Sequence, residues 1–381
     1  MGTVSVSVVR KGSYTKKKTR KLYAFSLISI LLNIMPDNSV YTGQGSSAIE
    51  EAYVRQFQEG FEQAYQQETS ILDPLVDRDT QSSEFKSYQR MGEAEEMTED
   101  TTRYGDNPVS EVPHDNRRIS LRHFELGKYI DPKDLMKVVS DPSNGYNAAL
   151  LKSGKRKRDD FLIEKYFADA YTGKEGSTVM SYATAATAEN SATITVGEYS
   201  NGSSNKIAAT AGRYTLAAGN KEGISVGSSF DGSTGTASCL TIEKLKGLRS
   251  AMLRVEAIQQ EDVLPMLLTS YQLEDLLGQE EIINSDFSVR KNLAEGNITT
   301  FMGYRFILCE RLPLSTGADG DERRCMVFTP KALKLTIGDD LKGNMWRDPS
   351  KKNIPYMHFK QSIGASRMWG EVAGEIRCLE A

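Results

Sequence analysis

Two runs of charged side chains are the densest concentrations of reactive groups in this sequence. We expect the carboxylates of the acidic run to be too close in sequence and too exposed to form a tuned acid–base pair. They indicate either solvated charge or docking on a basic surface of another subunit. The basic run indicates a solvated helix face, a contact with nucleic acid, or a salt-bridge partner for an acidic arm of a neighbour. The acidic run comprises Glu93, Glu95, Glu96, Glu99 and Asp100, and the basic run comprises Lys152, Lys155, Arg156, Lys157 and Arg158.

Other patterns that could support catalysis or cofactor binding are weak. Gly43–Ala48 fits G-x-G-x-x-A, but residues 36–42 before it are polar and proline-led, whereas a dinucleotide site needs a buried strand there. His114, His123 and His358 do not suggest a metal pair. The sequence has no G-x-S-x-G elbow and no Walker A loop. We therefore predict no catalytic, cofactor-binding or metal site, and a protein that is not an enzyme.

The four cysteines are scattered and form no C-x-x-C pair. A disulfide framework or a zinc site needs closer and paired spacing. We therefore predict reduced and mostly buried thiols in a product of the cytoplasm. The cysteines are Cys239, Cys309, Cys325 and Cys378.

The N-terminal residues differ in charge from the rest of the chain. Residues 1–35 contain seven basic residues and no acidic one, while the whole chain has a formal net charge of −4. The remainder is therefore clearly acidic, which argues against a general nucleic-acid binder. The apolar stretch Leu22–Ile34 is too short to span a bilayer comfortably. We interpret 1–35 as a non-native or poorly ordered extension, with translation starting at Met1 or at Met35.

A signal-peptide interpretation of residues 1–34 leads to a different function. A basic flank followed by a short apolar run is also typical of a secretion signal. The chain would then be a secreted or membrane-tethered surface-binding protein. Residues 177–238, rich in Ala, Ser, Thr and Gly, would be its recognition module.

An amphipathic helix is expected near the N-terminus. Ser47 and Glu50 fit a capping box. Apolar residues then recur every four positions and form one stripe, which predicts a helix that faces the core or docks on a neighbour. The stripe comprises Ile49, Tyr53, Phe57, Phe61 and Tyr65.

A long polar loop follows, between expected strands at 85–91 and 117–130. Each side of this loop could reach roughly 40 Å at about 3.3 Å per residue. So polar an arm cannot fold onto its own core, and ordering it costs conformational entropy. The pattern therefore predicts an extended hairpin that leans on another molecule, as in a building block that grips its neighbours.

The rest of the chain mixes helices with antiparallel strands. We expect a short helix from Asp131-Pro132, a long helix from Ser143 to Tyr171 ended by Gly173, and a β-rich insertion or surface lobe at 177–238. The mixture predicts an α+β fold. Further helices are expected at 242–255 and 270–277, strands at 265–268, 304–312 and 324–328, and two closing strands, 356–361 and 368–378, around a turn at Gly364–Arg367.

The order of these parts resembles that of the major capsid proteins of tailed double-stranded-DNA phages with the Hong-Kong-97-like fold, most closely the podophage-type branch. The resemblance covers roughly residues 46–381. It lies in Arg117-Arg118-Ile119-Ser120-Leu121, Tyr129-Ile130-Asp131, Ser140-Asp141-Pro142, Arg158-Asp159-Asp160, Ala170-Tyr171-Thr172-Gly173-Lys174 and Gly364-Ala365-Ser366-Arg367.

The resemblance implies a structural coat subunit with a long spine helix, an extended β-hairpin loop, and peripheral and axial domains. Such subunits form hexamers and pentamers of an icosahedral shell. Their partners are other copies, a scaffolding protein, a portal at one vertex and packaged double-stranded DNA bound non-specifically, with no membrane. Their location is the virion capsid, and the host cytoplasm during assembly. The implied parts are an arm at 36–83, the hairpin loop at 84–130, a peripheral domain at 131–176, an axial domain at 177–342 with its insertion at 177–238, and closing strands at 343–381.

Some capsids of this fold are joined by a lysine–asparagine bond whose lysine lies on the extended loop. This sequence has no lysine between Lys86 and Lys128, so we predict a shell without covalent cross-links. The predicted assembly contacts are the arm residues Tyr53, Phe57 and Phe61, the acidic Glu93, Glu95, Glu96 and Glu99, and the basic Lys155, Arg156, Lys157 and Arg158.

Overall fold

The chain divides into two units, residues 1–59 and 60–381, and every residue described below belongs to the second. The extension 1–35, the arm helix and the expected short helix at 132–142 therefore lie outside the described residues. The computed structural model describes residues 66–92, 94, 97, 99, 101, 103, 105–107, 109–131, 143–183, 192–197, 213–217, 219–230, 237–279, 300–316 and 320–380.

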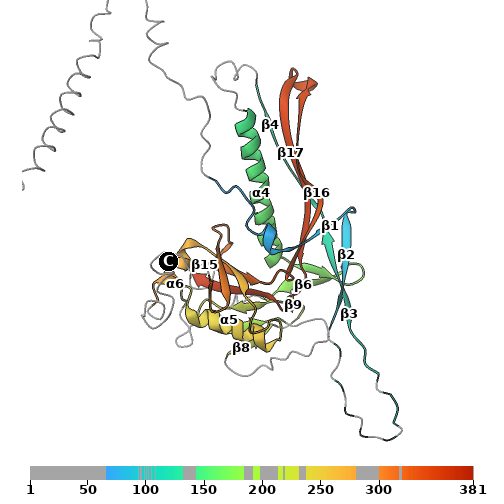
Figure 1. Ribbon diagram of the computed structural model, residues 1–381, viewed down its shortest axis with the longest axis vertical. Coiled ribbons are helices and arrows are strands. Elements are labelled where there is room, and N and C mark those ends of the chain that lie inside the picture. Colours follow the sequence, from blue (N-terminus) through green and yellow to red (C-terminus); the bar gives the residue numbers. More distant parts are fainter. Residues whose placement is uncertain are drawn as a thin grey trace, which may run out of the picture. The chain divides into compact units, whose positions relative to one another are not determined.

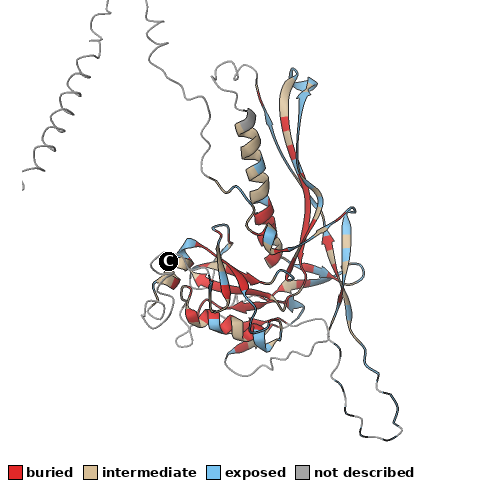
Figure 2. Cartoon of the chain, in the orientation of Figure 1, coloured by how far each residue is buried: buried red, intermediate tan, exposed pale blue. Residues whose placement is uncertain are grey.

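The long helix α4 (Ser143–Phe167) packs against a four-stranded sheet (Figure 1). The strand order is β1 (Asp77–Thr80), β16 (Leu333–Asp348), β17 (Ile354–Arg367) and β4 (Arg122–Tyr129). The helix is buried towards its C-terminal end, at Phe161, Leu162 and Tyr166. Figure 2 shows the remainder of α4 as mostly half-buried. Short 3₁₀ helices occupy Asp73–Leu75 and Pro349–Lys351.

The expected C-terminal end of this helix was placed too late. The helix ends at Phe167, and Ala170–Thr172 forms strand β5. The Ala168 amide still donates to the Glu164 carbonyl, but β5 pairs with its neighbouring strands instead of continuing the helix. Tertiary pairing therefore decided the conformation of Ala170 and Tyr171, which helical periodicity had assigned to the helix.

A nine-stranded sheet holds most of the remaining core. Helix α5 (Ile242–Arg254) packs on its strands, and Thr241 caps that helix by accepting a bond from the Lys244 amide at 3.3 Å. Helix α6 (Ser270–Leu277) has the expected range, and Gly278 is its C-cap. The strand order is β12 (Thr300–Phe301), β13 (Tyr304–Leu308), β11 (Leu264–Leu268), β15 (Asp321–Phe328), β18 (Ala373–Leu379), β10 (Ile224–Val226), β7 (Ile194–Val196) and β8 (Tyr214–Leu216), with β14 (Leu314–Thr316) beside β15.

The stretch 177–238 is β-rich, as expected, but its described strands do not form a surface lobe. Strands β7, β8 and β10 extend the nine-stranded sheet, and every residue of β7 and β10 is buried. Because its strands are short and lie between polar stretches, we expected a β-rich insertion or surface lobe here. The pairing of β10 with β18 instead places β7 and β10 in the core.

A five-stranded sheet carries the expected hairpin. Strand β2 (Phe85–Met91) pairs in antiparallel fashion with β3 (His114–Ser120), and the sheet continues through β5, β6 (Thr178–Tyr182) and β9 (Lys221–Glu222). The single strand expected at 117–130 is divided at Leu121, whose amide donates to the Glu84 carbonyl. β3 then belongs to the hairpin and β4 to the sheet beside α4.

The expected hairpin of two closing strands is wrong. Gly364–Arg367 lies inside β17 and is mostly buried, and β18 pairs with β15 and β10 rather than with β17. A Cβ at Gly364 would come within 2.6 Å of the Thr336 hydroxyl and 2.8 Å of the Ser120 carbonyl. The glycine therefore permits close approach of neighbouring backbone, not a turn.

Candidate functional site

A segment of the chain that precedes β1 is clasped against helix α4. The buried carboxylate of Asp159 accepts hydrogen bonds from the Ser70 hydroxyl, from the Ile71 and Leu72 amides at 3.0 and 3.2 Å, and from the Gln67 amide group at 2.5 Å. Hydrogen bonds to a carboxylate are stronger than those between neutral groups. These hydrogen bonds to Asp159 fix residues 67–72 along one side of α4.

Part of the predicted basic run is used inside the subunit. Arg158 is buried and donates to Asp73 at 3.0 Å and to Asp340 at 2.6 Å. Burial by itself would lower the pKa of Arg158, but the hydrogen bonds to Asp340 and Asp73 outweigh it and raise the pKa. Arg156 donates to Gln66, and Lys152 pairs with Glu68 at 2.7 Å.

The other two predicted basic residues face accessible surfaces. Lys157 is exposed, with its ammonium 5.3 Å from the Phe124 ring centre. Lys155 lines a polar depression of about 380 Å³ together with Ser70 and Asp340. Of the four basic residues predicted as assembly contacts, these two keep their charge available to a neighbouring molecule.

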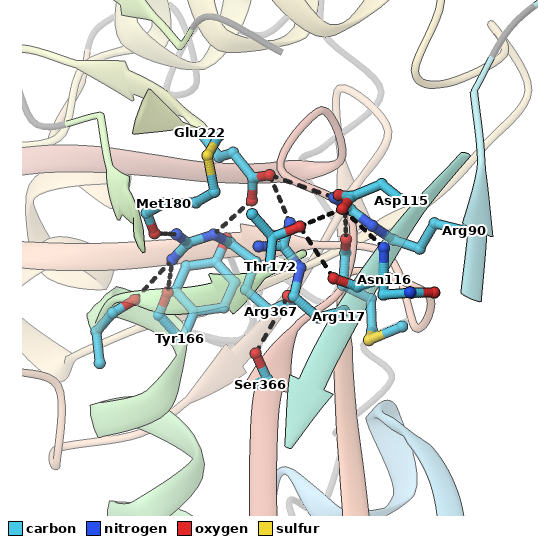
Figure 3. A network of polar contacts seen from close by, with 12 residues as sticks. Arg90, Asp115, Asn116, Arg117, Tyr166, Thr172, Met180, Glu222, Ser366 and Arg367 are labelled. Atoms are coloured by element: carbon cyan, nitrogen blue, oxygen red, sulfur yellow. Dashed lines mark hydrogen bonds and ion pairs between the residues drawn. The ribbon is translucent and has the colours of Figure 1, made fainter. Parts of the chain in front are cut away.

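The base of the hairpin carries a buried charged network that joins strands far apart in the sequence (Figure 3). Arg117 of β3 donates to Glu222 of β9 at 2.5 Å. Arg90 of β2 bonds Asp115 and lies 3.7 Å from Glu222. Arg367 of β17 places its Nε 3.6 Å from the second Glu222 oxygen. One carboxylate thus contacts three guanidinium groups from three strands.

The negative charge around these arginines comes from two further sources. Arg367 donates to the Tyr166 and Ala168 carbonyls at 2.7 and 3.1 Å, where the α4 dipole is negative. Asp115 supplies the second carboxylate. Its burial would raise the pKa of Asp115, but bonds from the Thr172 hydroxyl and from Arg90 lower it. The hairpin base is therefore tied electrostatically to both α4 and the five-stranded sheet.

Beyond its base, the hairpin connection leaves its described residues in solvent. Met97 and Val109 are exposed by 102% and 88%, and Glu99 is also exposed. Glu93, Glu95 and Glu96 lie outside the described residues, as do the arm residues Tyr53, Phe57 and Phe61. Most of the described residues of this connection are therefore exposed to solvent.

Groupings suited to catalysis or metal binding do not appear among the described side chains. No cluster of three metal-ligating residues occurs there. His123 bonds the Ser362 hydroxyl at 2.7 Å, and His358 lies 3.5 Å from Glu125. The four cysteines are free thiols, and burial raises the pKa of Cys309. No described helix is both long and apolar enough to cross a bilayer.

Sequence reasoning missed the arginine network. Arg117 and Glu222 are 105 positions apart, and no spacing rule connects them. The one local signal was the presence of Arg90 and Arg117 inside strands with few apolar residues. Inward-facing arginines in such strands need buried carboxylates, but the sequence does not show which carboxylates these are.

Comparisons with known proteins were made for the sequence and for the fold. No curated protein matches the sequence. The fold resembles the capsid of the cyanophage P-SCSP1u, with 15% identity, a TM-score of 0.59, and 89% of this chain and 96% of that chain covered. It also resembles the mature capsid of bacteriophage PhiM1, with 12% identity, a TM-score of 0.56, and 86% and 92% coverage. A third similar structure is the capsid of the empty GTA particle, with 13% identity, a TM-score of 0.55, and 91% and 100% coverage.

A family described as phage capsid protein matches residues 49–380, which is most of the chain. The α+β arrangement of α4, the long-stranded sheet beside it and the nine-stranded sheet agrees with the fold of the similar capsids. The chain therefore belongs to the phage capsid protein family, as a structural and non-enzymatic component of the virion shell.

Proposed function

We propose that this chain is the major capsid subunit that assembles into hexamers and pentamers of an icosahedral shell around double-stranded DNA. A scaffolding protein would direct assembly, and a portal would occupy one vertex. The observation that carries the proposal is the β2–β3 hairpin, whose base is held by buried arginines while Met97 and Val109 beyond it stay in solvent. A hairpin that is fixed at its base and exposes apolar side chains beyond it is suited to contact a neighbouring copy.

The charged residues would set the alignment of neighbouring subunits. In this proposal Glu93, Glu95, Glu96 and Glu99 of one copy approach Lys155 and Lys157 of the next. Each exposed pair contributes only about 0–1 kcal/mol. The pairs therefore fix which residues face one another and do not drive assembly.

Burial of apolar side chains would supply the driving force. Covering a large apolar side chain contributes about 1.5–3 kcal/mol, and the arm offers Tyr53, Phe57 and Phe61 in every copy. Identical interfaces repeat throughout a closed symmetric shell, so modest contributions accumulate.

Electron microscopy of the full chain, produced with and without its scaffolding protein, tests the proposal. We expect closed shells, and a paired Lys155→Glu and Lys157→Glu variant should reduce shell yield by at least about tenfold. The matched control is Lys331→Glu, an exposed lysine between β15 and β16. A wild-type chain that stays monomeric under all these conditions would overturn the proposal.

We also propose that the shell is held without lysine–asparagine bonds, because the hairpin loop has no lysine between Lys86 and Lys128. Mature shells boiled in detergent should run as a single band of subunit mass on a denaturing gel. A ladder of multimers joined through lysine would contradict this.

A further inference from the structure

Helix α5 has two different faces. Its inner face packs in the core through Leu245, Leu248 and Met252, which are fully buried. Its outer face carries a shallow apolar depression of about 420 Å³, and Figure 2 shows exposed and half-buried residues on this helix beside the buried ones. The helical residues of this α5 depression share one face, because they follow one another at helical spacing. The α5 depression is lined by Lys246, Arg249, Ser250, Leu253, Arg254 and Met302.

The turn before β13 brings Met302 into this depression. Met302 and Gly303 join β12 to β13 and have positive φ angles of 51° and 79°. A two-residue hairpin turn of this kind favours Asn or Gly at its first position, and another residue in the left-handed region costs about 1–2 kcal/mol. The strained turn thus holds a flexible thioether in the same depression as Leu253, which is 36% exposed. Methionine is common on surfaces that adapt to a partner.

Arg249 is fixed at the rim of the depression by backbone carbonyls. It donates to the carbonyls of Gln260 at 2.7 Å, Asp262 at 3.2 Å and Gly303 at 3.3 Å. A Cβ at Gly303 would overlap the Arg249 guanidinium, so the close approach requires a glycine there. Because these acceptors are uncharged, they orient the guanidinium without neutralising it.

Two further cations complete the rim. Arg254 lies with its guanidinium 5.1 Å from the Tyr214 ring centre. Lys246 pairs with Glu243 at 2.8 Å, and both side chains of that pair are 45% exposed. Such a pair contributes only about 0–1 kcal/mol, so either member can exchange its partner. Among the described carboxylates, none forms an ion pair with Arg249 or Arg254. The rim therefore offers positive charge around an apolar floor.

This combination favours an acidic helix over nucleic acid or a second copy of the chain. A phosphate backbone would use the cations but would gain nothing from the apolar floor of Leu253 and Met302. An amphipathic helix laid in a groove brings an apolar anchor together with charged residues on its neighbouring turns. In the proposed function, the acidic run of the hairpin loop is already assigned to Lys155 and Lys157 of a neighbour. The scaffolding protein is the partner that remains, and a small contact suits it, because small interfaces are weak and reversible.

We propose that the α5 depression binds an acidic amphipathic helix of the scaffolding protein. One large apolar side chain of that helix lies between Leu253 and Met302, and carboxylates on its neighbouring turns pair with Arg249 and Arg254. The apolar anchor supplies most of the affinity, and the charge pairs fix the orientation of the helix. This inference rests on the proposed coat function, because it names the surface through which the scaffolding protein directs assembly.

Binding of purified, fluorescently labelled scaffolding protein to the unassembled subunit tests the inference by anisotropy titration. Leu253→Gln removes the apolar wall, and Arg254→Glu reverses a charge of the rim. Each substitution should raise the dissociation constant at least about tenfold. Added salt should weaken the binding of the wild type more than that of Arg254→Glu, because salt screens the charge pairs.

The matched controls are Leu314→Gln, a leucine of β14 that is 48% exposed, and Lys331→Glu, which makes the same change of charge as Arg254→Glu. Both should leave the dissociation constant unchanged. The thermal midpoint of every variant should stay within about 2 °C of the wild type, since exposed substitutions change stability little. Arg254→Glu carries the measurement if Leu253→Gln lowers the midpoint further.

Photo-cross-linking identifies the occupant directly. A benzophenone maleimide is attached to Ser250→Cys in a Cys239→Ser background, because the other three cysteines are buried. Irradiation in the presence of the scaffolding protein should yield a cross-linked scaffolding peptide with acidic residues on both sides of a large apolar residue, as read by mass spectrometry. The same label on Leu314→Cys should give no such peptide.

Each alternative outcome has a separate meaning. Unchanged binding by both Leu253→Gln and Arg254→Glu would overturn the inference and leave the coat function standing. Cross-links from Ser250→Cys to another copy of the chain, or a loss of binding to a short DNA duplex rather than to the scaffolding protein in Arg254→Glu, would assign the depression to a different occupant and also overturn it. Failure of the wild-type chain to form shells with its scaffolding protein contradicts the coat function itself.

Discussion

The nine-stranded sheet and the four-stranded sheet of this subunit use their apolar residues in different ways. In the nine-stranded sheet, all five residues of β11 are buried, and so are all residues of β7 and β10. In the four-stranded sheet beside α4, Phe124 is the one residue of β4 that is not exposed. The distal half of β16 is also mostly exposed.

This difference shows which part of the subunit is complete by itself. The nine-stranded sheet and α5 lie in one hydrophobic core together with the buried ends of α4, β16 and β17. The sheet beside α4 ends in solvent, with Met345 and Trp346 exposed near its tip and an apolar groove along its side. Apolar surface of that kind marks an interaction site, which agrees with a protein whose function is to contact its neighbours.

The largest effect is expected at the hairpin base, where β2, β3, β9 and β17 meet. Glu222→Gln removes the carboxylate that contacts Arg90, Arg117 and Arg367. Loss of one partner from a buried charge network costs about 3–5 kcal/mol, so the free energy of unfolding should fall by that amount in urea titration of the unassembled subunit.

The control for that measurement is Glu243→Gln, which breaks the exposed pair between Glu243 and Lys246 on α5. A surface pair contributes about 0–1 kcal/mol. Equal losses for Glu222→Gln and Glu243→Gln would mean that the buried network does not hold the hairpin.

A pair of leucine truncations compares the two sheets directly. Leu267→Ala in β11 removes a fully buried side chain and should cost about 2–5 kcal/mol of unfolding free energy. Leu126→Ala in β4 should change the stability of the unassembled subunit by less than about 0.5 kcal/mol, because that side chain is 42% exposed.

Leu126→Ala, which should hardly change the stability of the unassembled subunit, should nevertheless lower the shell yield. Among subunits that remain folded, Leu126→Ala should reduce assembly, since it removes a wall of the groove. Differential scanning calorimetry and particle counts by electron microscopy measure the two effects separately. A large stability loss in Leu126→Ala would show that β4 belongs to the core.

The smallest effect is expected from the link between β1 and the hairpin. Asp79 accepts bonds from Lys86 at 2.6 Å and from the Tyr88 hydroxyl at 2.7 Å, which lower the pKa of Asp79 to about 2. Since its pKa in the unfolded chain is higher, near 3.9, the stabilisation is present above about pH 4 and is lost as the pH falls towards 2.

The side chain of Asp79 is one-third exposed, so this stabilisation amounts to only about 0–1 kcal/mol. Unfolding titrations at pH 5 and pH 2.5 should show that the wild type loses more stability than Asp79→Asn over this interval. Identical losses in the two proteins would show that Asp79 does not contribute to this pH dependence of stability.

Local sequence signals were sufficient for several elements. The range of β2, 85–91, and that of α6, 270–277, were predicted without error, because apolar spacing, a capping position and a following glycine act within a few residues. Helix α5 was predicted to within one residue for the same reason. Such signals do not depend on where the rest of the chain lies.

Long-range pairing explains the elements that were wrong. Gly364 was expected in a turn because glycine favours turns, but Thr336 and Ser120, distant in sequence, come close to it inside a strand. The strands of 177–238 were too short to be recognised as core, and they became core through pairing with β18. The basic run was predicted to face outward as a whole, while Asp73 and Asp340 take Arg158 into the interior.

The sequence by itself determined the α+β composition, the two charged runs, the absence of a lysine between Lys86 and Lys128, and the order of parts that resembles a phage coat protein. Each of these depends on residue type and short spacing alone. Only the tertiary structure decided that Glu222 holds three arginines, that Lys155 and Lys157 rather than Arg156 and Arg158 stay available, and that a groove opens beside α4. The charged contacts join residues 85 or more positions apart, and chain folding, not local propensity, brings such residues together.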